Sequence, residues 1–279
     1  MAIDVCAEVI ANTPLSSDYH VLQLAAPAIA HAVEPGQFVM VRMSGSRDPL
    51  LRRPFSVFQT LRDGAGAPIG ITVFSKRIGP STRLLYDARP GQHVDCLGPL
   101  GTPWTRTAFA AHDRPAYLVA GGVGLAAFAI FAEWLAQRGV ATTLFYGART
   151  GAELFALEVF RATGAAMVLT TEDGSVGEQG RVTGPLTLAL ADATSRPVVY
   201  ACGPEGMMKA VTAIAGRAGA PCYVSMERIM GCGLGGCYSC VVPMRTEAGG
   251  AHHVRSCLAG PVMDGHSIVW DVPGHPGTS

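Results

Sequence analysis

The chain has 279 residues, of which 49% are hydrophobic and 15% are charged, and its formal net charge is zero. This length allows two or three domains, each with its own core. A neutral chain without a long basic run is not typical of nucleic-acid-binding proteins. Its eight cysteines are too few in so long a chain for a disulfide-stapled scaffold.

Residues 1–104 consist mostly of short apolar runs separated by Pro, Gly and Asp. The runs are VCAEVIA, YHVLQLAA, GQFVMVRM, FSVFQT, PIGITVFSK and QHVDCLG. Each has the length and composition of a strand, and STRLLYDA at 81–88 is the one short helical candidate. Six strands with so little helix favour a small antiparallel barrel or sandwich.

The pattern changes near Ala116. AYLVA, ATTLFYG, AAMVLTTEDG and RPVVYACG read as strands, and they alternate with predicted helices at 125–139, 151–164, 183–193 and 204–219. Such alternation predicts βαβ units and a parallel sheet. The last segment is rich in loops, glycine and cysteine. We therefore expect three domains, at 1–105, 112–220 and 221–279.

Two features bear on the compartment. Residues 115–132 carry no charge over 18 residues, close to the length of a membrane span, but glycines interrupt them. A buried strand, turn and helix explain this run better, so we expect no membrane span. The N-terminus has no basic region and carries Asp4 and Glu8, unlike a secretory signal. These features favour a cytoplasmic protein.

A glycine loop, AGGVGLAA at 120–127, follows the first strand of the predicted parallel sheet. G-x-G-x-x-A between a strand and a helix lets backbone amides approach a pyrophosphate, although a plain tight turn also favours glycine. The strand–turn–helix context favours a dinucleotide site. The next strand ends in FYGART, without the acidic residue of common dehydrogenases. Another nucleotide-binding α/β fold is therefore indicated.

Two further motifs could carry redox chemistry. In YACGP at 200–204, Cys202 ends a strand at the edge where parallel sheets bind ligands. RRPFSV at 52–57 could present a cation, a ring and a hydroxyl to a flavin. An equally weighted alternative is a basic edge strand with Phe55 in the core.

The stretch GCGLGGCYSC at 231–240 is the densest in sulfur. Cys232, Cys237 and Cys240 follow C-x4-C-x2-C, with Cys257 after sixteen more residues. This spacing is that of plant-type two-iron clusters, and the glycines leave room for the inorganic core. Zinc is the alternative, with His252 and His253 as added ligands.

Four cysteines fall outside the cluster motif. We expect Cys6, Cys96 and Cys222 to be small buried hydrophobic residues. Cys202 is the exception, because of its place at the sheet edge.

In this order the motifs resemble those of the electron-transfer subunit of class 1B dihydroorotate dehydrogenase, within the ferredoxin–NADP reductase superfamily. The resemblance covers nearly the whole chain. The matching segments are LLRRPFSV, VDCLGPLG, VAGGVGLA, TEDGSVGEQGRVT, YACGPEGMMKA, VSMERIMGCGLGGCYSC and CLAGPV. The resemblance implies a multidomain β plus α/β fold: an antiparallel flavin-binding barrel, a central parallel-sheet NAD-binding domain and a loop-rich [2Fe-2S] module.

The resemblance also implies roles for single residues. Ser56 and Cys202 would lie nearest the reacting groups, as catalytic residues. FAD would be held by Arg53, Pro54, Phe55, Ser56, Ser75, Lys76, Arg77, Ser81 and Thr82. NAD would be held by Gly122, Gly124, Asp173 and Gly203. The cluster ligands would be Cys232, Cys237, Cys240 and Cys257.

The implied function is electron transfer between NAD and a partner dehydrogenase subunit, through FAD and the cluster. The partner would be the FMN-containing catalytic subunit of dihydroorotate dehydrogenase in a heterotetramer, within pyrimidine biosynthesis. Ser75 and Lys76 stand where the family usually has tyrosine and arginine, and Ser81 where it has glycine. These departures put the partner in question.

Three alternatives remain open. The chain could be a reductase component for another dehydrogenase or an oxygenase. A more distant possibility is a non-enzymatic nucleotide-binding module with structural zinc. For the coenzyme, Glu172 and Asp173 favour NAD over NADP, whereas Arg149 keeps NADP open.

Overall fold

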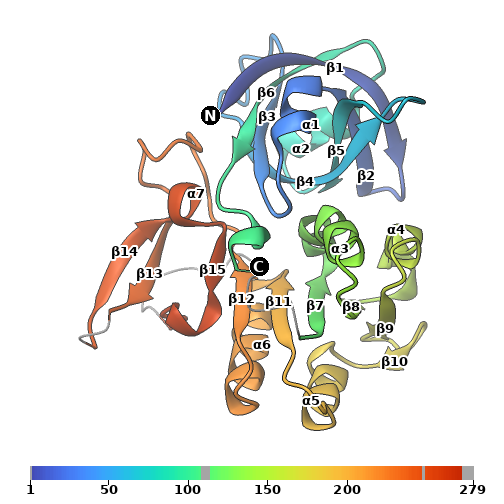
Figure 1. Cartoon of the computed structure of the whole chain (residues 1–279). Coiled ribbons are helices and arrows are strands. Elements are labelled where there is room, and N and C mark those ends of the chain that lie inside the picture. The colour runs from blue at the N-terminus through green and yellow to red at the C-terminus, as the bar shows by residue number, and fades with distance from the viewer. Residues whose placement is uncertain (1, 108–113, 247–248, 272–279) are drawn as a thin grey trace.

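The computed structural model of the chain describes residues 2–107, 114–246 and 249–271. Figure 1 shows a barrel at the N-terminal end, a central sheet with helices, and a smaller C-terminal module beside the sheet. This is the three-part fold expected from the sequence. The expected domain limits at residues 1, 112 and 279 lie outside the described residues.

The barrel is closed and has the strand order β1-β2-β5-β4-β3-β6, with antiparallel neighbours. Its strands are β1 (Ile3–Pro14), β2 (Tyr19–Ala25), β3 (Phe38–Met43), β4 (Arg53–Arg62), β5 (Pro68–Lys76) and β6 (His93–Leu100). Alternate residues such as Leu22, Leu24 and Val73 fill the interior and are fully buried. Two short helices, α1 (Pro27–Ala32) and α2 (Pro80–Tyr86), complete this part.

The central sheet has the order β10-β9-β8-β7-β11-β12-β15. Its parallel strands are β7 (Ala116–Gly121), β8 (Thr142–Ala148), β9 (Ala166–Thr171), β10 (Glu178–Gln179), β11 (Val198–Cys202) and β12 (Cys222–Ser225). The helices are α3 (Ala129–Ala136), α4 (Leu157–Arg161), α5 (Thr183–Ala191) and α6 (Glu205–Arg217). The alternation of strands and helices thus follows the prediction.

Two predicted helices are shorter than expected. The segment 125–139 begins as the 3₁₀ helix η3 (Gly122–Phe128) and becomes α3 only at Ala129. The segment 151–164 divides into η4 (Gly151–Glu153) and α4. It divides because Leu154 is extended and Ala156 has a left-handed conformation, with φ 55°. Within the described ranges, no helix is long and apolar enough to cross a membrane.

The C-terminal segment contributes to two structures. A two-stranded sheet of β13 (Val241–Arg245) and β14 (Ala251–Arg255) leads into α7 (Ser256–Ala259). The chain then returns to the central sheet, where β15 (Val262–Asp264) pairs antiparallel with β12 and η5 (Gly265–Ser267) follows. Strand β12 itself pairs with β11, so the central sheet takes in residues beyond position 220.

Trp104, in the 3₁₀ turn η1 (Trp104–Arg106), joins the barrel to the central sheet. Its indole Nε1 donates to the carbonyl oxygen of Ala127 at 2.8 Å, and its ring stacks on Phe128 and Phe131. Phe58 and Phe74 of the barrel belong to the same buried cluster. Because this core is continuous, the barrel and the sheet hold a fixed relative position.

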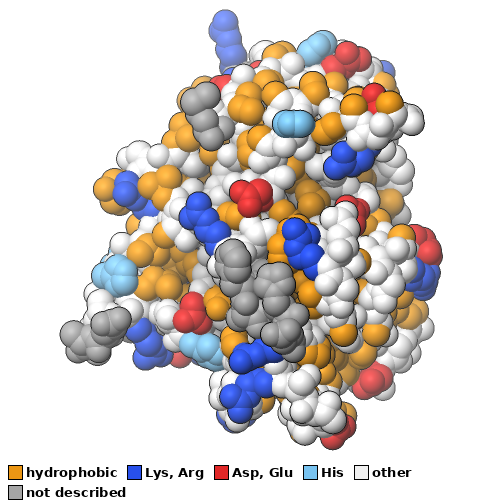
Figure 2. All heavy atoms as spheres, in the orientation of Figure 1, with side chains coloured by type: hydrophobic (Ala, Val, Ile, Leu, Met, Phe, Trp, Pro, Cys, Tyr) orange, Lys and Arg blue, Asp and Glu red, His pale blue; other side chains and the backbone are white. Residues whose placement is uncertain are grey.

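The surface is mixed in character. On the face drawn in Figure 2, basic and acidic side chains are interspersed among apolar ones. That distribution agrees with the formal net charge of zero.

Candidate functional site

The order of the central sheet reverses between β7 and β11, which are neighbours although three strands, β8, β9 and β10, and the helices between them separate them in the chain. In open parallel sheets, ligands bind in the crevice beyond the carboxyl ends of the strands at such a point. Here β7 ends in the glycine loop with Gly122 and Gly124, and β11 ends at Cys202 and Gly203. The structure therefore brings these four predicted residues together.

Glycine is required at three of these positions. Gly122 has φ 52° and Gly203 has φ 155°. A Cβ added to Gly124 would lie 2.7 Å from the amide nitrogen of Gly203, and closer still to the carbonyl of Cys202. The two loops therefore touch through their backbones.

Cys202 lies in this crevice as a neutral thiol. Burial, assisted by the negative charge of Glu227, raises its pKa to about 12, and a hydrogen bond with Ser225 opposes the rise. A thiol with this pKa is protonated at neutral pH and is a poor nucleophile. Cys202 is thus suited to contact a ring by its polarisable sulfur and not to attack it.

Strand β4 places the flavin motif between the other two parts of the chain. Ser56 lies directly across from Phe38 of β3, and Pro54 lies across from Met40. Phe38 and Met40 are buried together with Cys240 and Cys257. Because paired residues point to the same side of a sheet, Ser56 and Pro54 face the side of the barrel that carries the cysteine module.

The neighbouring residues of this motif face the other way. Phe55 pairs with Val39 and packs against the barrel core, which makes it a core residue in the described structure. Strand β4 also contacts η3 and α3 of the central domain. The segment from Pro54 to Phe58 therefore lies beside η3, which begins with the glycine loop, and one strand away from the residues of β3 that pack with the cysteine module.

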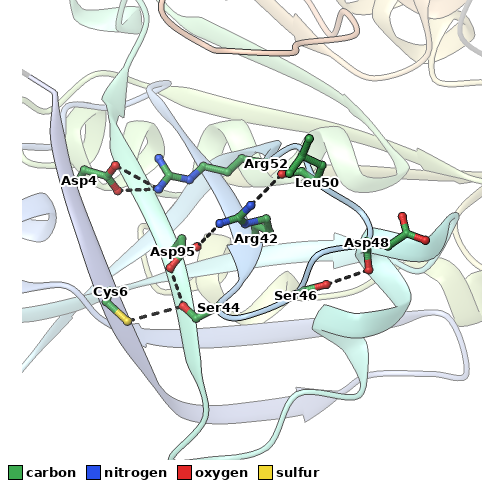
Figure 3. Close-up of polar contacts among 9 residues, drawn as sticks. All are labelled: Asp4, Cys6, Arg42, Ser44, Ser46, Asp48, Leu50, Arg52 and Asp95. Atoms are coloured by element: carbon green, nitrogen blue, oxygen red, sulfur yellow. Dashed lines mark hydrogen bonds and ion pairs between the residues drawn. The ribbon is translucent and has the colours of Figure 1, made fainter.

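Arg53 follows a loop that ion pairs hold in place (Figure 3). Arg42 donates to Asp95 at 2.7 Å and to the carbonyl oxygen of Leu50 at 2.9 Å. Arg52 pairs with Asp4 at 2.8 Å. Hydrogen bonds from Ser44 and Arg42 lower the pKa of Asp95, which keeps the carboxylate charged. The guanidinium of Arg53, the first residue of β4, donates to the carbonyl oxygens of Leu51 and Arg52.

The end of β5 presents its three predicted residues differently. Ser75 alternates with Val73 and Ile71 and is buried on the inner side of the barrel, where its hydroxyl has no partner within the described residues. Lys76 lies over the ring of Tyr19 at 5.0 Å. Arg77 pairs with Asp18 at 3.3 Å. A ligand on the outer face of the barrel would meet Ser75 through its backbone alone.

Ser81 and Thr82 lie in the first turn of α2, which begins at Pro80. The Thr82 hydroxyl accepts the amides of Ile78 and Gly79, each at 2.9 Å. Thr82 therefore orders the loop before the helix. First-turn amides have no partner within their own helix, and Ser81 contributes one of them.

Asp173 lies beyond β9, two strands away from the glycine loop in the sheet order. Its carboxylate accepts the amide of Ser175 at 3.0 Å and the hydroxyl of Ser175 at 2.6 Å. The Ser175 hydroxyl bond, followed by the amide bond, lowers the pKa of Asp173. The position suits the outer end of an extended dinucleotide.

The four cluster cysteines influence one another. Cys232 acts on the pKa of both Cys237 and Cys257, and Cys240 acts on that of Cys257. Bonds from the Ser239 hydroxyl and amide, and contact with Cys232, lower the pKa of Cys237 to about 6. Burial, followed by the neighbouring Cys240, raises the pKa of Cys257 to about 12. Iron binding would displace these protons, because thiolates are the ligands.

The donor set fits an iron–sulfur cluster in its chemistry. Among the residues that the structure describes, no group of three or more His, Cys, Asp or Glu side chains converges on one point. Four thiolates, two to each iron, are what two irons joined by bridging sulfides require. In the cysteine loop, Leu234 donates its amide to the sulfur of Cys232 at 3.3 Å.

The cysteine loop rests on the barrel. A Cβ on Gly233 would lie 2.7 Å from Cγ of Met40 and 3.1 Å from Leu100. Arg255 donates to the carbonyl oxygen of Gly235 at 2.7 Å and lies over the ring of Tyr238. The contacts of Gly233 place the loop against β3 and β6, and β3 is the neighbour of the strand that carries Ser56.

One cysteine differs from expectation. Cys96 and Cys222 are buried, but Cys6 is exposed and lies 3.6 Å from the hydroxyl of Ser44. The prediction for Cys6 was wrong because Cys6 alternates with the buried Ala7 along β1 and therefore faces outward from the barrel.

An ion pair that the sequence did not single out links the nucleotide loop to the cysteine loop. Arg228 donates to Glu205 at 2.5 Å, with side chains 13% and 20% exposed. Glu205 begins α6 directly after Gly203 and Pro204, and Arg228 precedes the cysteines. Both residues stand in recognisable motifs, but nothing in the sequence indicates that they meet.

Three family models match the chain. The oxidoreductase FAD-binding domain matches residues 6–104, the oxidoreductase NAD-binding domain matches 118–213, and the iron–sulfur cluster binding domain of dihydroorotate dehydrogenase B matches 227–269. The chain thus carries FAD-, NAD- and iron–sulfur-binding domains of an oxidoreductase.

Relatives match over most of their length. The electron transfer subunit of dihydroorotate dehydrogenase B (NAD(+)) from Desulforamulus reducens is 34% identical over 95% of this chain and 98% of that protein. The corresponding subunit from Geobacillus kaustophilus is 38% identical over 89% and 91%.

Solved structures agree in fold. A chain of the NADH-dependent reduced ferredoxin–NADP oxidoreductase, described for flavin-based electron bifurcation, has a TM-score of 0.81 at 27% identity, over 95% of this chain and 90% of that one. A ferredoxin NADP+ reductase from Neisseria gonorrhoeae with bound FAD and NADP has a TM-score of 0.64 at 16% identity, over 81% and 94%. At that identity the second match shows the fold alone.

Proposed function

The chain belongs to the family of electron transfer subunits of dihydroorotate dehydrogenase B, and from that premise we propose that it passes electrons between NAD and a dihydroorotate-oxidising partner subunit. The route would use an iron–sulfur cluster and FAD. We further propose that the cluster is of the two-iron type, held by Cys232, Cys237, Cys240 and Cys257. The C-x4-C-x2-C spacing and the mutual influence of the four thiols support that type.

One observation carries the proposal. The face of β4 with Pro54 and Ser56 lies next to Phe38 and Met40, against which the cysteine loop packs. The same strand contacts η3, which begins with the glycine loop. A flavin on this face would therefore lie between a pyridine nucleotide and a cluster, as an electron relay requires.

FAD, when bound, supplies a group that accepts a hydride and exchanges single electrons. The residues of the chain would bind and orient the reactants. Arg53, held at the start of β4, would offer its charge to the diphosphate, and Ser56 would offer a hydroxyl to the ring. Cys202 would remain a protonated thiol against the nicotinamide, because burial holds its pKa far above neutrality.

The partner would be a catalytic subunit that carries FMN, in a heterotetramer, and the setting would be pyrimidine biosynthesis. The names of the relatives describe electron transfer subunits, which implies a catalytic subunit beside them. Thiolate ligands of a cluster are compatible with a reducing compartment, so we place the protein in the cytoplasm.

A second function has one observation in its favour. The similarity to a chain of the NADH-dependent reduced ferredoxin–NADP oxidoreductase extends over 95% of this chain. With the same three domains, the chain could therefore transfer electrons to or from a different flavoprotein partner. The departures at Ser75, Lys76 and Ser81 are compatible with such a change of partner.

The deciding experiment begins with the purified chain under anaerobic conditions. Visible spectra before and after NADH, with assays of iron, acid-labile sulfide and zinc, would give flavin bands and a two-iron absorption that bleach with NADH. A colourless, zinc-containing protein would contradict the proposal. NAD reduction by dihydroorotate after mixing with a dihydroorotate dehydrogenase catalytic subunit would then separate the proposed partner from the alternative one.

A further inference from the structure

Arg149 occupies the position that decides coenzyme choice in dinucleotide-binding sheets. It directly follows β8, the strand next to the one that carries the glycine loop. In such folds, the end of this second strand meets the adenosine ribose, where an acidic residue binds the 2′-hydroxyl of NAD or an arginine accommodates the 2′-phosphate of NADP. Taken alone, Arg149 would favour NADP.

The structure gives Arg149 a partner. Its guanidinium donates to Glu153 twice, from one terminal nitrogen at 2.6 Å and from Nε at 3.2 Å. This two-point arrangement gives the arginine–carboxylate pair a defined geometry. The Arg149 side chain is 67% exposed, whereas the Glu153 side chain is 22% exposed. The acid is therefore the fixed member of the pair.

The backbone holds Glu153 where it is. Its amide donates to the carbonyl oxygen of Thr150 in η4, and its own carbonyl accepts the hydroxyl of the buried Tyr146 at 3.2 Å. The bond from Arg149 lowers the pKa of Glu153, so its carboxylate is ionised at neutral pH.

The neighbouring loop adds further negative charge. The amide of Asp173 donates to the carbonyl oxygen of Arg149 at 3.2 Å, and the Ser175 hydroxyl joins the Asp173 carboxylate to the amide of Gly151. Glu172 lies on the same loop, 3.9 Å from Arg181. Two arginines therefore face three carboxylates around this end of the sheet.

We propose that Glu153 is a specificity-determining residue for the coenzyme, because it occupies Arg149 and sets a fixed negative charge where the 2′-phosphate of NADP would bind. The inference rests on the proposed NAD-dependent function and extends it to one side chain. A 2′-phosphate carries close to two negative charges at neutral pH, so it would have to displace Glu153 from Arg149 and then remain beside it. The uncharged 2′-hydroxyl of NAD neither has to displace Glu153 from Arg149 nor is repelled by it.

The test is Glu153→Gln in the full chain with its cofactors, titrated calorimetrically with NAD+, NADP+, 5′-ADP and 2′,5′-ADP. We expect the affinity for 2′,5′-ADP relative to 5′-ADP to rise about tenfold, as one close like-charge repulsion is removed and Arg149 is released. The NADP+ to NAD+ ratio should rise in parallel. The double variant R149Q/E153Q should lose this gain, because the freed arginine would be absent.

Glu158→Gln is the matched control. Glu158 also forms an ion pair with an arginine, Arg161, and it lies on α4 away from the loop of Asp173. In this variant the affinity for 2′,5′-ADP relative to 5′-ADP should stay within twofold of the value for the unaltered protein.

The outcomes separate the inference from the function on which it rests. An unchanged 2′,5′-ADP to 5′-ADP ratio in Glu153→Gln, with normal NAD+ binding, would overturn the role of Glu153 and leave the function intact. A gain that persists in R149Q/E153Q would also overturn it, since Arg149 would not be the phosphate ligand. An unaltered protein that binds neither NAD+ nor 5′-ADP would instead overturn the proposed function.

Discussion

A Cβ atom added to Gly124 would lie 2.7 Å from the amide nitrogen of Gly203, well inside van der Waals contact. These two glycines belong to separate motifs 79 residues apart in the chain, yet they meet where the order of the sheet reverses. The contact brings the glycine loop and the end of β11 together as one surface, where we propose that a pyridine nucleotide binds.

Gly124→Ala should therefore weaken NAD+ binding by at least tenfold, because the two loops must separate to admit the methyl group. Flavin and iron contents should remain normal, since the barrel and the cysteine loop are not touched. Gly184→Ala, in α5 with open space around it, is the control and should bind NAD+ normally. Calorimetric NAD+ titration of both variants checks this, and normal affinity in Gly124→Ala would argue against the crevice as the nucleotide site.

Cys237→Ser should remove the cluster and spare hydride transfer from NADH to the flavin. Serine is a poor substitute for a thiolate, and the cysteine loop and the glycine loop are separate structures. Iron and sulfide assays, with NADH-dependent reduction of the flavin, measure the two effects. Cys6→Ser changes an exposed cysteine outside the module and should leave both intact. Equal loss of both activities in Cys237→Ser would mean that the module is needed to form the flavin site.

Arg228→Gln should reduce the free energy of unfolding by about 1–3 kcal/mol, because it leaves the half-buried carboxylate of Glu205 without its partner. Lys209→Gln is the comparison on the same helix α6. Its pair with Asp271 is exposed at both ends, so the loss should be below about 1 kcal/mol. Urea unfolding of the two variants measures the difference, and equal midpoints would count against a structural link through Arg228.

His20 should make the protein less stable as the pH falls from about 6.5 to about 4. Burial lowers its pKa from 6.5 to about 4, against an opposing effect of Asp87. In this pH range His20 is protonated in the unfolded chain but neutral in the folded chain. The stability that is present above pH 6.5 is therefore lost progressively as the pH falls below it. The shift corresponds to about 3 kcal/mol.

The surroundings of the two ring nitrogens of His20 explain why the folded protein keeps the imidazole neutral. Nδ1 donates to Asn12 at 2.7 Å, and Nε2 is buried without a partner among the described residues. His20→Gln should therefore show a flatter dependence of its urea midpoint on pH between 7 and 4.5. An identical slope in the variant and the unaltered protein would exclude His20 as the cause.

Much of the architecture could be predicted from local patterns. The alternation of apolar residues predicted the barrel strands, because one side of each strand must be buried. Likewise AGGVGLAA and the cysteine spacing predicted loops, since few residues other than glycine tolerate such close backbone approach. The helix expected at 151–164 failed in its first half, where Tyr146 and the loop of Ser175 hold the backbone in other conformations.

The site itself shows the limit of sequence reasoning. The sequence alone determined which chemical groups are available: thiols at cluster spacing, a glycine loop after a strand, and an arginine before an aromatic residue and a serine. Tertiary structure alone decided which of them meet. It placed Ser56 across from Phe38 and packed Phe55 against the barrel core. It also paired Arg149 with Glu153 and Arg228 with Glu205. Motif spacing is fixed along the chain, whereas the partner of a charge or the side faced by a strand residue depends on elements that only folding brings together.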